Sequence, residues 1–197
     1  MLTPVILATF ISVCLPMADP VVAHALVATG SSGEPLTVMD AAGQKLAGGT
    51  ERELAAALKA APADQELYVG LTQIPRSALI KLGIPPESTL APCTNLRIGY
   101  QLYSEAREVV AASQKNPKKL MAVSINYYRN RQKTAEGAYA QKAADAFTKP
   151  AFSPPASFGS RLHMAIAAQA MRSDASTLHQ TGGQIARLTV ARLNNPQ

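Results

Sequence analysis

The chain has 197 residues, of which 47% are hydrophobic and 16% are charged. This balance is typical of a globular domain and argues against a disordered chain. Trp is absent and aromatic residues make up only 5%, so Ala, Leu, Ile and Val must build most of the core. No apolar run reaches the roughly 18 residues that would span a bilayer, which argues against an internal transmembrane helix.

Charge is distributed unevenly along the chain, whose formal net charge is +6. Residues 1–44 contain no Lys or Arg, whereas residues 115–149 hold eight basic and two acidic side chains. A basic surplus of this kind suits a polyanionic partner such as nucleic acid, anionic lipid or a cell-wall polymer, and it equally suits a solvated basic face. Because no recognition helix or aromatic platform accompanies the basic residues, we expect no nucleic-acid partner.

The first segment has two interpretations. Residues 4–13 form an apolar run of signal-peptide length, and Ala23 and Ala25 make an A-x-A site, but no basic residue precedes the run. Apolar residues in this segment also recur at helical spacing, namely Ile6, Phe10, Val13 and Cys14. We favour a mature amphipathic helix that ends near Pro16, followed by a second helix over 21–29.

Further elements follow from caps, breakers and periodicity. Thr50 caps a helix that continues to Lys59, residues 67–74 form a short apolar segment, and Pro85 and Pro86 predict a loop. Additional helices are expected at 76–82, 94–112, 120–128 and 136–147. The domain is therefore expected to be mainly α and to cover residues 1–148.

The end of the chain differs in composition. Residues 149–158 contain three prolines and predict a stiff linker, after which 161–171 is a candidate helix and the rest is polar. Residues 149–197 are therefore expected to be a linker and a largely unstructured tail.

Cysteine is rare in this sequence, with Cys14 and Cys93 as its two occurrences. Neither stands in a C-x-x-C spacing, so we expect no metal site. Two independent buried thiols and one disulfide are both compatible with the sequence.

Four motif segments occur in a recognisable order, the second and third of them close together. Residues 28–38 (ATGSSGEPLTV) resemble the E-S-G-x-N-P-x-A-I segment of lysozyme-like lytic transglycosylases. Residues 68–84 (YVGLTQIPRSALIKLGI) are similar to the same family's D-x-G-L-x-Q-I-N run. Residues 91–96 (APCTNL) come soon after and resemble its D-P-C-x-N-L segment. Residues 124–142 (SINYYRNRQKTAEGAYAQK) resemble its S-x-Y-N-T-G segment followed by G-Y-V-x-K. The family segments that 91–96 and 124–142 resemble are those of the branch that serves type IV secretion systems.

This resemblance covers about residues 5–147 and implies a fold like that of goose-type lysozyme and soluble lytic transglycosylases. It implies a periplasmic or envelope-associated protein with an atypical export signal, whose folded domain begins at Met1. It also implies a disulfide between Cys14 and Cys93. Family members cleave the bond between N-acetylmuramic acid and N-acetylglucosamine in peptidoglycan without water, and they need no metal or other cofactor.

The resemblance also marks a missing group, because Gly30 stands where the family has its catalytic glutamate. That glutamate acts as both acid and base, and glycine transfers no proton. Other positions depart too, since Ala91 replaces the aspartate, Pro75 an asparagine, and Tyr128 and Arg129 the expected Thr and Gly.

These departures predict a non-catalytic accessory or scaffold protein of a type IV secretion or conjugation machine, one that binds wall glycan or machine components. The expected groove residues are those at matching motif positions, namely Ser31, Gln73, Tyr127 and Tyr139. The basic stretch after Lys115 would face the anionic wall or a partner. The alternative is an active lytic transglycosylase that uses a displaced carboxylate, for which Glu34 is the candidate, although we expect it in a turn that leaves the cleft.

Overall fold

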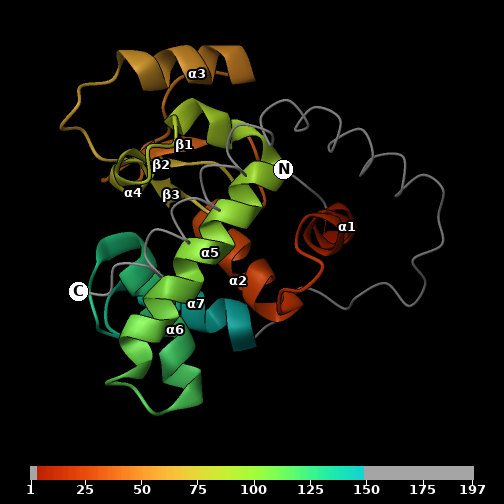
Figure 1. Cartoon of the computed structure of the whole chain (residues 1–197), viewed down its shortest axis with the longest axis vertical. Coiled ribbons are helices and arrows are strands. Elements are labelled where there is room, and N and C mark those ends of the chain that lie inside the picture. Colours follow the sequence, from red (N-terminus) through yellow and green to blue (C-terminus); the bar gives the residue numbers. More distant parts are fainter. Residues whose placement is uncertain (1–3, 149–197) are drawn as a thin grey trace, which may run out of the picture.

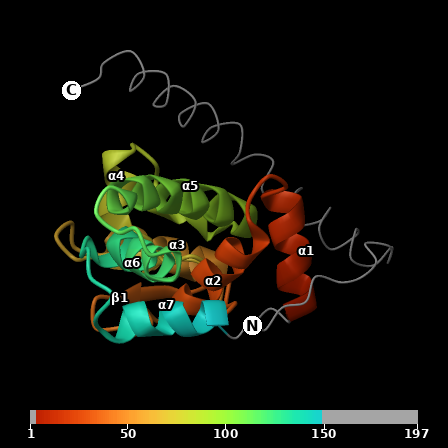
Figure 2. The same ribbon diagram turned by 90° about the horizontal axis from the view of Figure 1, so that it is seen from below.

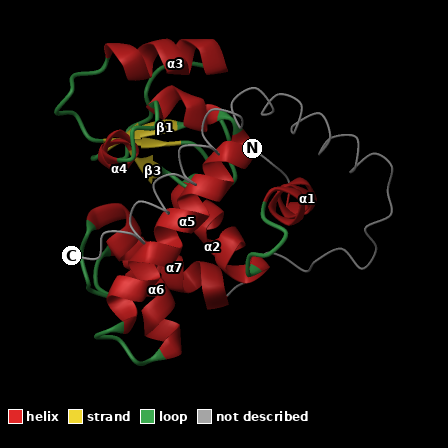
Figure 3. Ribbon diagram, in the orientation of Figure 1, coloured by secondary structure: helices red, strands yellow, loops and turns green. Residues whose placement is uncertain are grey.

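The computed structural model of the chain describes residues 4–148, and the expected linker, tail and candidate helix 161–171 lie outside these residues. Helices dominate this part of the chain, with a small sheet at one end (Figures 1 and 3). The helices are α1 (Pro4–Cys14), α2 (Pro20–Gly30), α3 (Glu51–Ala60), α4 (Arg76–Lys81), the 3-10 helix η1 (Pro86–Leu90), α5 (Pro92–Ala111), α6 (Pro117–Asn130) and α7 (Ala138–Thr148). The expected mainly helical class is confirmed.

The long helix α5 connects the two ends of the fold. The sheet, α3 and α4 lie near its N-terminal half, while α6 and α7 lie near its C-terminal half (Figure 1). Viewed from below, α6 lies between α5 and α7, and α1 stands to one side next to α2 (Figure 2). Helix α2 packs against α1, α5 and α7 and therefore runs through the middle of the described structure.

The sheet has three short antiparallel strands in the order β1 (Val38–Asp40), β2 (Leu67–Val69) and β3 (Ile74–Pro75). Val38 pairs with Val69, which in turn pairs with Ile74. The apolar segment expected at 67–74 is thus a hairpin, and β1 was not predicted. A strand of three residues carries almost no periodicity, and its pairing partner is distant in sequence.

Helix starts follow local capping rules. The Asp19 side chain accepts a hydrogen bond from the Val21 amide at 2.9 Å, and Pro20 occupies the first turn of α2. Thr50 caps α3 as expected, and Glu53 completes a capping box with it. The prediction of a loop at Pro85 and Pro86 is wrong from Pro86 onward, where the helix η1 begins. A proline fits the first turn of a helix, since its missing amide proton has no partner there.

Helix α1 packs through a face slightly rotated from the predicted one. Ile6 is partly buried but packs against the core as expected, whereas Val13 is partly buried and is absent from that contact, so its expected place on the inward face is wrong. Phe10 and Cys14 are buried as predicted, and Leu7 and Ile11 are buried as well. They pack against a cluster on α2, α5 and the turn after β2 that comprises Ala23, Val27, Leu71, Cys93 and Leu96.

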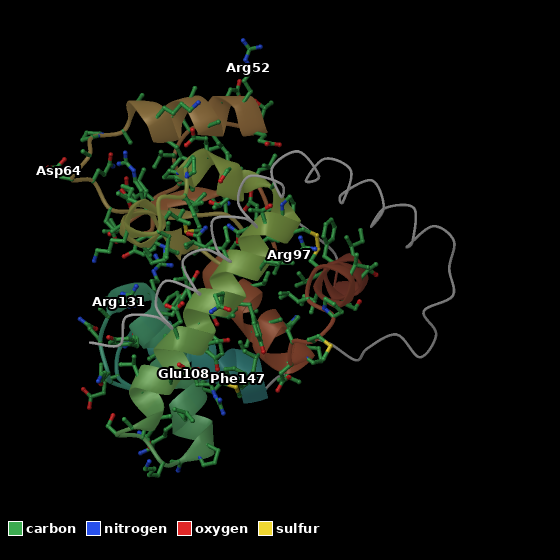
Figure 4. All side chains as sticks on the ribbon, viewed as in Figure 1. Arg52, Asp64, Arg97, Glu108, Arg131 and Phe147 are labelled. Atoms are coloured by element: carbon green, nitrogen blue, oxygen red, sulfur yellow. A yellow bond between two sulfur atoms is a disulfide. The ribbon has the colours of Figure 1, made fainter. Side chains whose placement is uncertain are left out.

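A disulfide joins Cys14 at the end of α1 to Cys93 at the start of α5, with their Cα atoms 5.2 Å apart. Arg97, labelled in Figure 4, adds a second link because its Nε donates to the Cys14 carbonyl oxygen at 3.0 Å. Helix α1 is thereby held to the rest of the fold covalently and by hydrogen bonding.

Residues 70–73, here called the GLTQ turn, connect β2 to β3 and are tied to α5 by Asn95. The fully buried Asn95 side chain accepts from the Thr72 amide and hydroxyl, both at 2.8 Å. Its amide nitrogen donates to the carbonyl oxygens of Val69 at 2.8 Å and Thr89 at 2.9 Å. From α6, the Tyr128 hydroxyl donates to the Thr72 carbonyl oxygen at 3.0 Å. The turn is therefore fixed from two helices at once.

Candidate functional site

An open cavity of about 340 Å³ lies at the C-terminal end of α2. The side chains and backbone around it come from the end of α2, the loop after it, β1, the loop after β1, α6 and α7. They are Thr29, Gly30, Ser31, Ser32, Glu34, Met39, Lys45, Arg129, Tyr139 and Lys142. The first and last of the motif segments found in the sequence therefore meet in space.

Gly30 is the residue at which α2 touches the GLTQ turn. A Cβ atom added to Gly30 would lie 3.0 Å from the Leu71 carbonyl oxygen and 3.2 Å from Cγ of Gln73. Both distances are tighter than ordinary carbon contacts, so the turn would have to move by a few tenths of an ångström. The turn is fixed through Thr72, and position 30 is thus shaped for glycine by packing.

Ser31 lies in the cavity wall, and its side chain shapes the loop that follows. It is only 5% exposed, and its Oγ accepts from the amides of Gly33 and Glu34, both at 3.2 Å. The oxygen therefore fixes the turn that leads into β1, in the manner of a serine turn.

Gln73 and Tyr127 do not line the cavity. Gln73 is fully buried beneath Gly30, and its Nε2 donates to the Gly70 carbonyl oxygen at 2.8 Å. Its Oε1 has no hydrogen-bond partner among residues 4–148. Tyr127 is half-buried against the core, with the Arg131 guanidinium 5.6 Å from its ring centroid. Of the four expected groove residues, the fold brings Ser31 and Tyr139 to the cavity.

Tyr139 holds an arginine in place at the cavity. The Arg129 guanidinium carbon lies 4.0 Å from the ring centroid of Tyr68 and 4.6 Å from that of Tyr139. Both distances are within the range of a favourable cation–π contact. Burial raises the pKa of the Tyr139 hydroxyl, and the neighbouring Arg129 opposes part of that rise.

Glu34 lies in the cavity wall, so its expected position in a turn that leaves the cleft is wrong. The tight turn held by Ser31 brings residue 34 back to the cavity. Its carboxylate forms an ion pair with Lys45, and its side chain is 38% exposed. A general acid of this chemistry needs an apolar, enclosed setting, which this carboxylate lacks.

Sequence reasoning missed the cations of the cavity, Arg129, Lys142 and Lys45. The sequence did mark Arg129, because it departs from the motif of the resembling family, which has glycine at this position. It marked Lys142 too, because this residue ends the segment that resembles G-Y-V-x-K, but Lys142 was not named as a site residue. Burial lowers the pKa of the Lys142 ammonium, and the nearby positive charge of Arg129 lowers it further.

Metal and membrane features were searched over residues 4–148. This part of the chain holds no group of three or more His, Cys, Asp or Glu that could bind a metal ion. None of its helices combines the length and apolar character needed to cross a bilayer. His24 is buried inside α2, away from the residues that line the cavity.

Comparisons with known proteins give no relative for this chain, since no family model, no curated protein and no solved structure matches it.

Proposed function

We propose that this protein is a non-catalytic, lytic-transglycosylase-like protein of lysozyme-like fold that binds the glycan of the bacterial cell wall. In this proposal it serves as an accessory or scaffold of a type IV secretion or conjugation machine in the envelope. The observation that carries the proposal is the meeting of four separate motif segments around the C-terminal end of α2.

Each motif segment contributes to that meeting point. The first supplies Gly30 and Ser31, and the second supplies the GLTQ turn on which Gly30 packs. The third supplies Asn95, which holds that turn, and the fourth supplies Arg129 and Tyr139. Segments that share one site are expected to converge in this way, whereas chance matches scattered between residues 28 and 142 are not.

The absence of catalysis is supported by how position 30 is packed. The Gln73 side chain and the Leu71 carbonyl oxygen occupy the space next to Gly30. The carboxylate that does line the cavity, Glu34, is paired with Lys45. A proton donor must be enclosed and protonated before it reacts, so this pair is a poor substitute.

An envelope location is supported by the disulfide. Disulfides persist in oxidising compartments such as the bacterial periplasm and are rare in the cytosol. The Cys14–Cys93 pair joins the segments that the resemblance predicts would be joined.

The proposal is tested by incubating the purified full-length protein with isolated sacculi. Sedimentation measures binding, and mass spectrometry of the supernatant detects released anhydromuropeptides. We expect the protein to sediment with the sacculi and to release none, with an active lytic transglycosylase as the positive control. Failure to sediment would refute wall binding.

A Glu34→Gln variant distinguishes the alternative function in the same assay. Release of anhydromuropeptides by the natural protein and its loss in the variant would establish an active enzyme that uses Glu34. Equal sedimentation of the natural protein and the variant, without release from either, agrees with the proposal.

A further inference from the structure

The cavity at the end of α2 has an excess of positive charge. Three cationic side chains line it, those of Lys45, Arg129 and Lys142, against the single carboxylate of Glu34. Lys45 and Glu34 form an ion pair and cancel each other. Within residues 4–148 neither Arg129 nor Lys142 forms an ion pair, so two positive charges remain uncompensated.

The backbone around the cavity does not cancel this excess. The C-terminal end of α2 contributes about half a negative charge at Gly30. The N-terminal end of α7 contributes about half a positive charge near Tyr139, which lies in its first turn. The two helix ends therefore offset each other. The electrostatic potential in the cavity is set by the charged side chains.

Arg129 is held ready for a ligand. The rings of Tyr68 and Tyr139 contact its guanidinium group and restrict its rotamers. A planar guanidinium donates two parallel hydrogen bonds to a carboxylate or phosphate, and holding it in place beforehand reduces the entropy lost on binding.

Lys142 supplies a second donor of a different kind. Its Nζ lies 3.5 Å from the Ser32 hydroxyl, at the edge of the cavity, and its side chain remains exposed. Two cations beside one another repel, which agrees with the direction in which Arg129 shifts the Lys142 pKa. A bound anion would relieve that repulsion.

We infer that this cavity is an anion-binding site for a ligand about the size of one sugar that carries a carboxylate or a phosphate group, held by Arg129 and Lys142. A volume of about 340 Å³ lies near the lower end of the range for small-molecule sites. If the proposed function holds, the carboxylate is the lactyl group of N-acetylmuramic acid, and this source of the anion rests on that proposal.

The test titrates the full-length, disulfide-intact protein with three probes in nuclear magnetic resonance experiments at low salt. The probes are N-acetylmuramic acid, N-acetylglucosamine and inorganic phosphate. The two sugars differ in the lactyl ether on O3, which carries the carboxylate, so their comparison reports the contribution of the lactyl group, and phosphate tests an anion without it. We expect the acidic sugar and phosphate to shift the same amide signals around residues 30–34 and 138–142, and to compete.

Charge-removing variants locate the site. Arg129→Gln should weaken binding by about tenfold or more, since hydrogen bonds to charged groups contribute the most. Lys142→Gln should weaken it by about threefold to tenfold, and because this side chain is exposed the variant is expected to fold. Lys119→Gln removes the same charge from an exposed position near the start of α6, and should change affinity less than about twofold.

The outcomes separate this inference from the proposed function. Binding of phosphate without binding of the acidic sugar would support the anion site and would count against wall sugar as its ligand. The inference would be overturned if neither phosphate nor the acidic sugar bound, or if the two sugars bound equally. It would also be overturned if neither Arg129→Gln nor Lys142→Gln changed the affinity. Sedimentation with sacculi would then still decide the proposed function on its own.

Discussion

Gly30 and Leu71 approach each other so closely that a Cβ atom on the glycine would lie 3.0 Å from the leucine carbonyl oxygen. The contact joins the end of α2 to the GLTQ turn. That turn cannot easily retreat, because Thr72 is bonded to Asn95 on one side and Tyr128 on the other. The position at which the resemblance predicts a catalytic glutamate is thus a packing contact.

Gly30→Ala should therefore lower the free energy of unfolding, by about 1 kcal/mol after the usual gain from replacing glycine in a helix is subtracted. Gly30→Glu should lower it further, because its side chain is larger. Chemical denaturation of the two variants beside the natural protein measures this. Gly83→Ala tests a glycine with open space around it, where the strain of a left-handed residue acts instead. An unchanged or higher stability of Gly30→Ala would show that the turn yields.

Local features were predictable from sequence where the deciding residues lie within one helical turn of each other. The Thr50 cap was predicted in this way, whereas the Asp19 cap and the helix start at Pro86 were not, although they follow the same local rules. Strand β1 was not, because it is stabilised by pairing with residues 67–69, nearly thirty positions away. No local pattern encodes that pairing.

The candidate site was predictable only in part. Ser31 and Tyr139 lie at the cavity as their motif positions imply. Gln73 is buried behind it, since the left-handed turn at φ 51° directs the chain beneath Gly30. The clustering of Arg129 with Lys142 depends on how α6 packs on α7, a relationship that residue spacing does not contain.

Two fully buried tyrosines form a matched pair, Tyr128 and Tyr103. The Tyr128 hydroxyl donates to Thr72, whereas the Tyr103 hydroxyl has no hydrogen-bond partner within residues 4–148. Tyr128→Phe should destabilise the protein by about 1 to 3 kcal/mol, because it leaves a buried carbonyl group with one partner fewer. Tyr103→Phe should leave stability unchanged or raise it. Equal losses in denaturation curves of both variants would contradict this distinction.

Tyr103 should also make the stability of the fold sensitive to alkaline pH. Burial raises the pKa of Tyr103 to about 12, whereas in the unfolded chain it titrates near 10. The folded state therefore favours the neutral hydroxyl, and stability should fall as pH rises from 10 through about 12. Tyr103→Phe should make that fall less steep. The slope of the unfolding free energy against pH should change by the amount that corresponds to one proton released on unfolding. An identical slope in the variant would argue that Tyr103 ionises freely.

The disulfide should contribute strongly to stability, because it closes a long loop. Cys14 and Cys93 are 79 positions apart, and chain entropy predicts about 4 kcal/mol for a loop of this length. Reduction, or replacement of both cysteines by serine, should lower the denaturation midpoint accordingly. Thiol titration before and after unfolding checks that the natural protein contains the bond. Coincident unfolding curves for oxidised and reduced protein would show that α1 contributes little to the cooperative core.

His24 should make the fold sensitive to mild acid. It is 7% exposed in the middle of α2, and burial lowers the pKa of its imidazole below the ordinary value near 6.5. The unfolded state then binds the proton more readily, so stability is fully present above pH 6.5 and is lost as pH falls through the lowered folded-state pKa. His24→Gln should remove this part of the pH dependence while leaving carboxylate effects below pH 5 in place. Thermal unfolding at pH 7.5 and pH 5.5 measures the difference, and an equal drop in melting temperature for both proteins would place the acid sensitivity elsewhere.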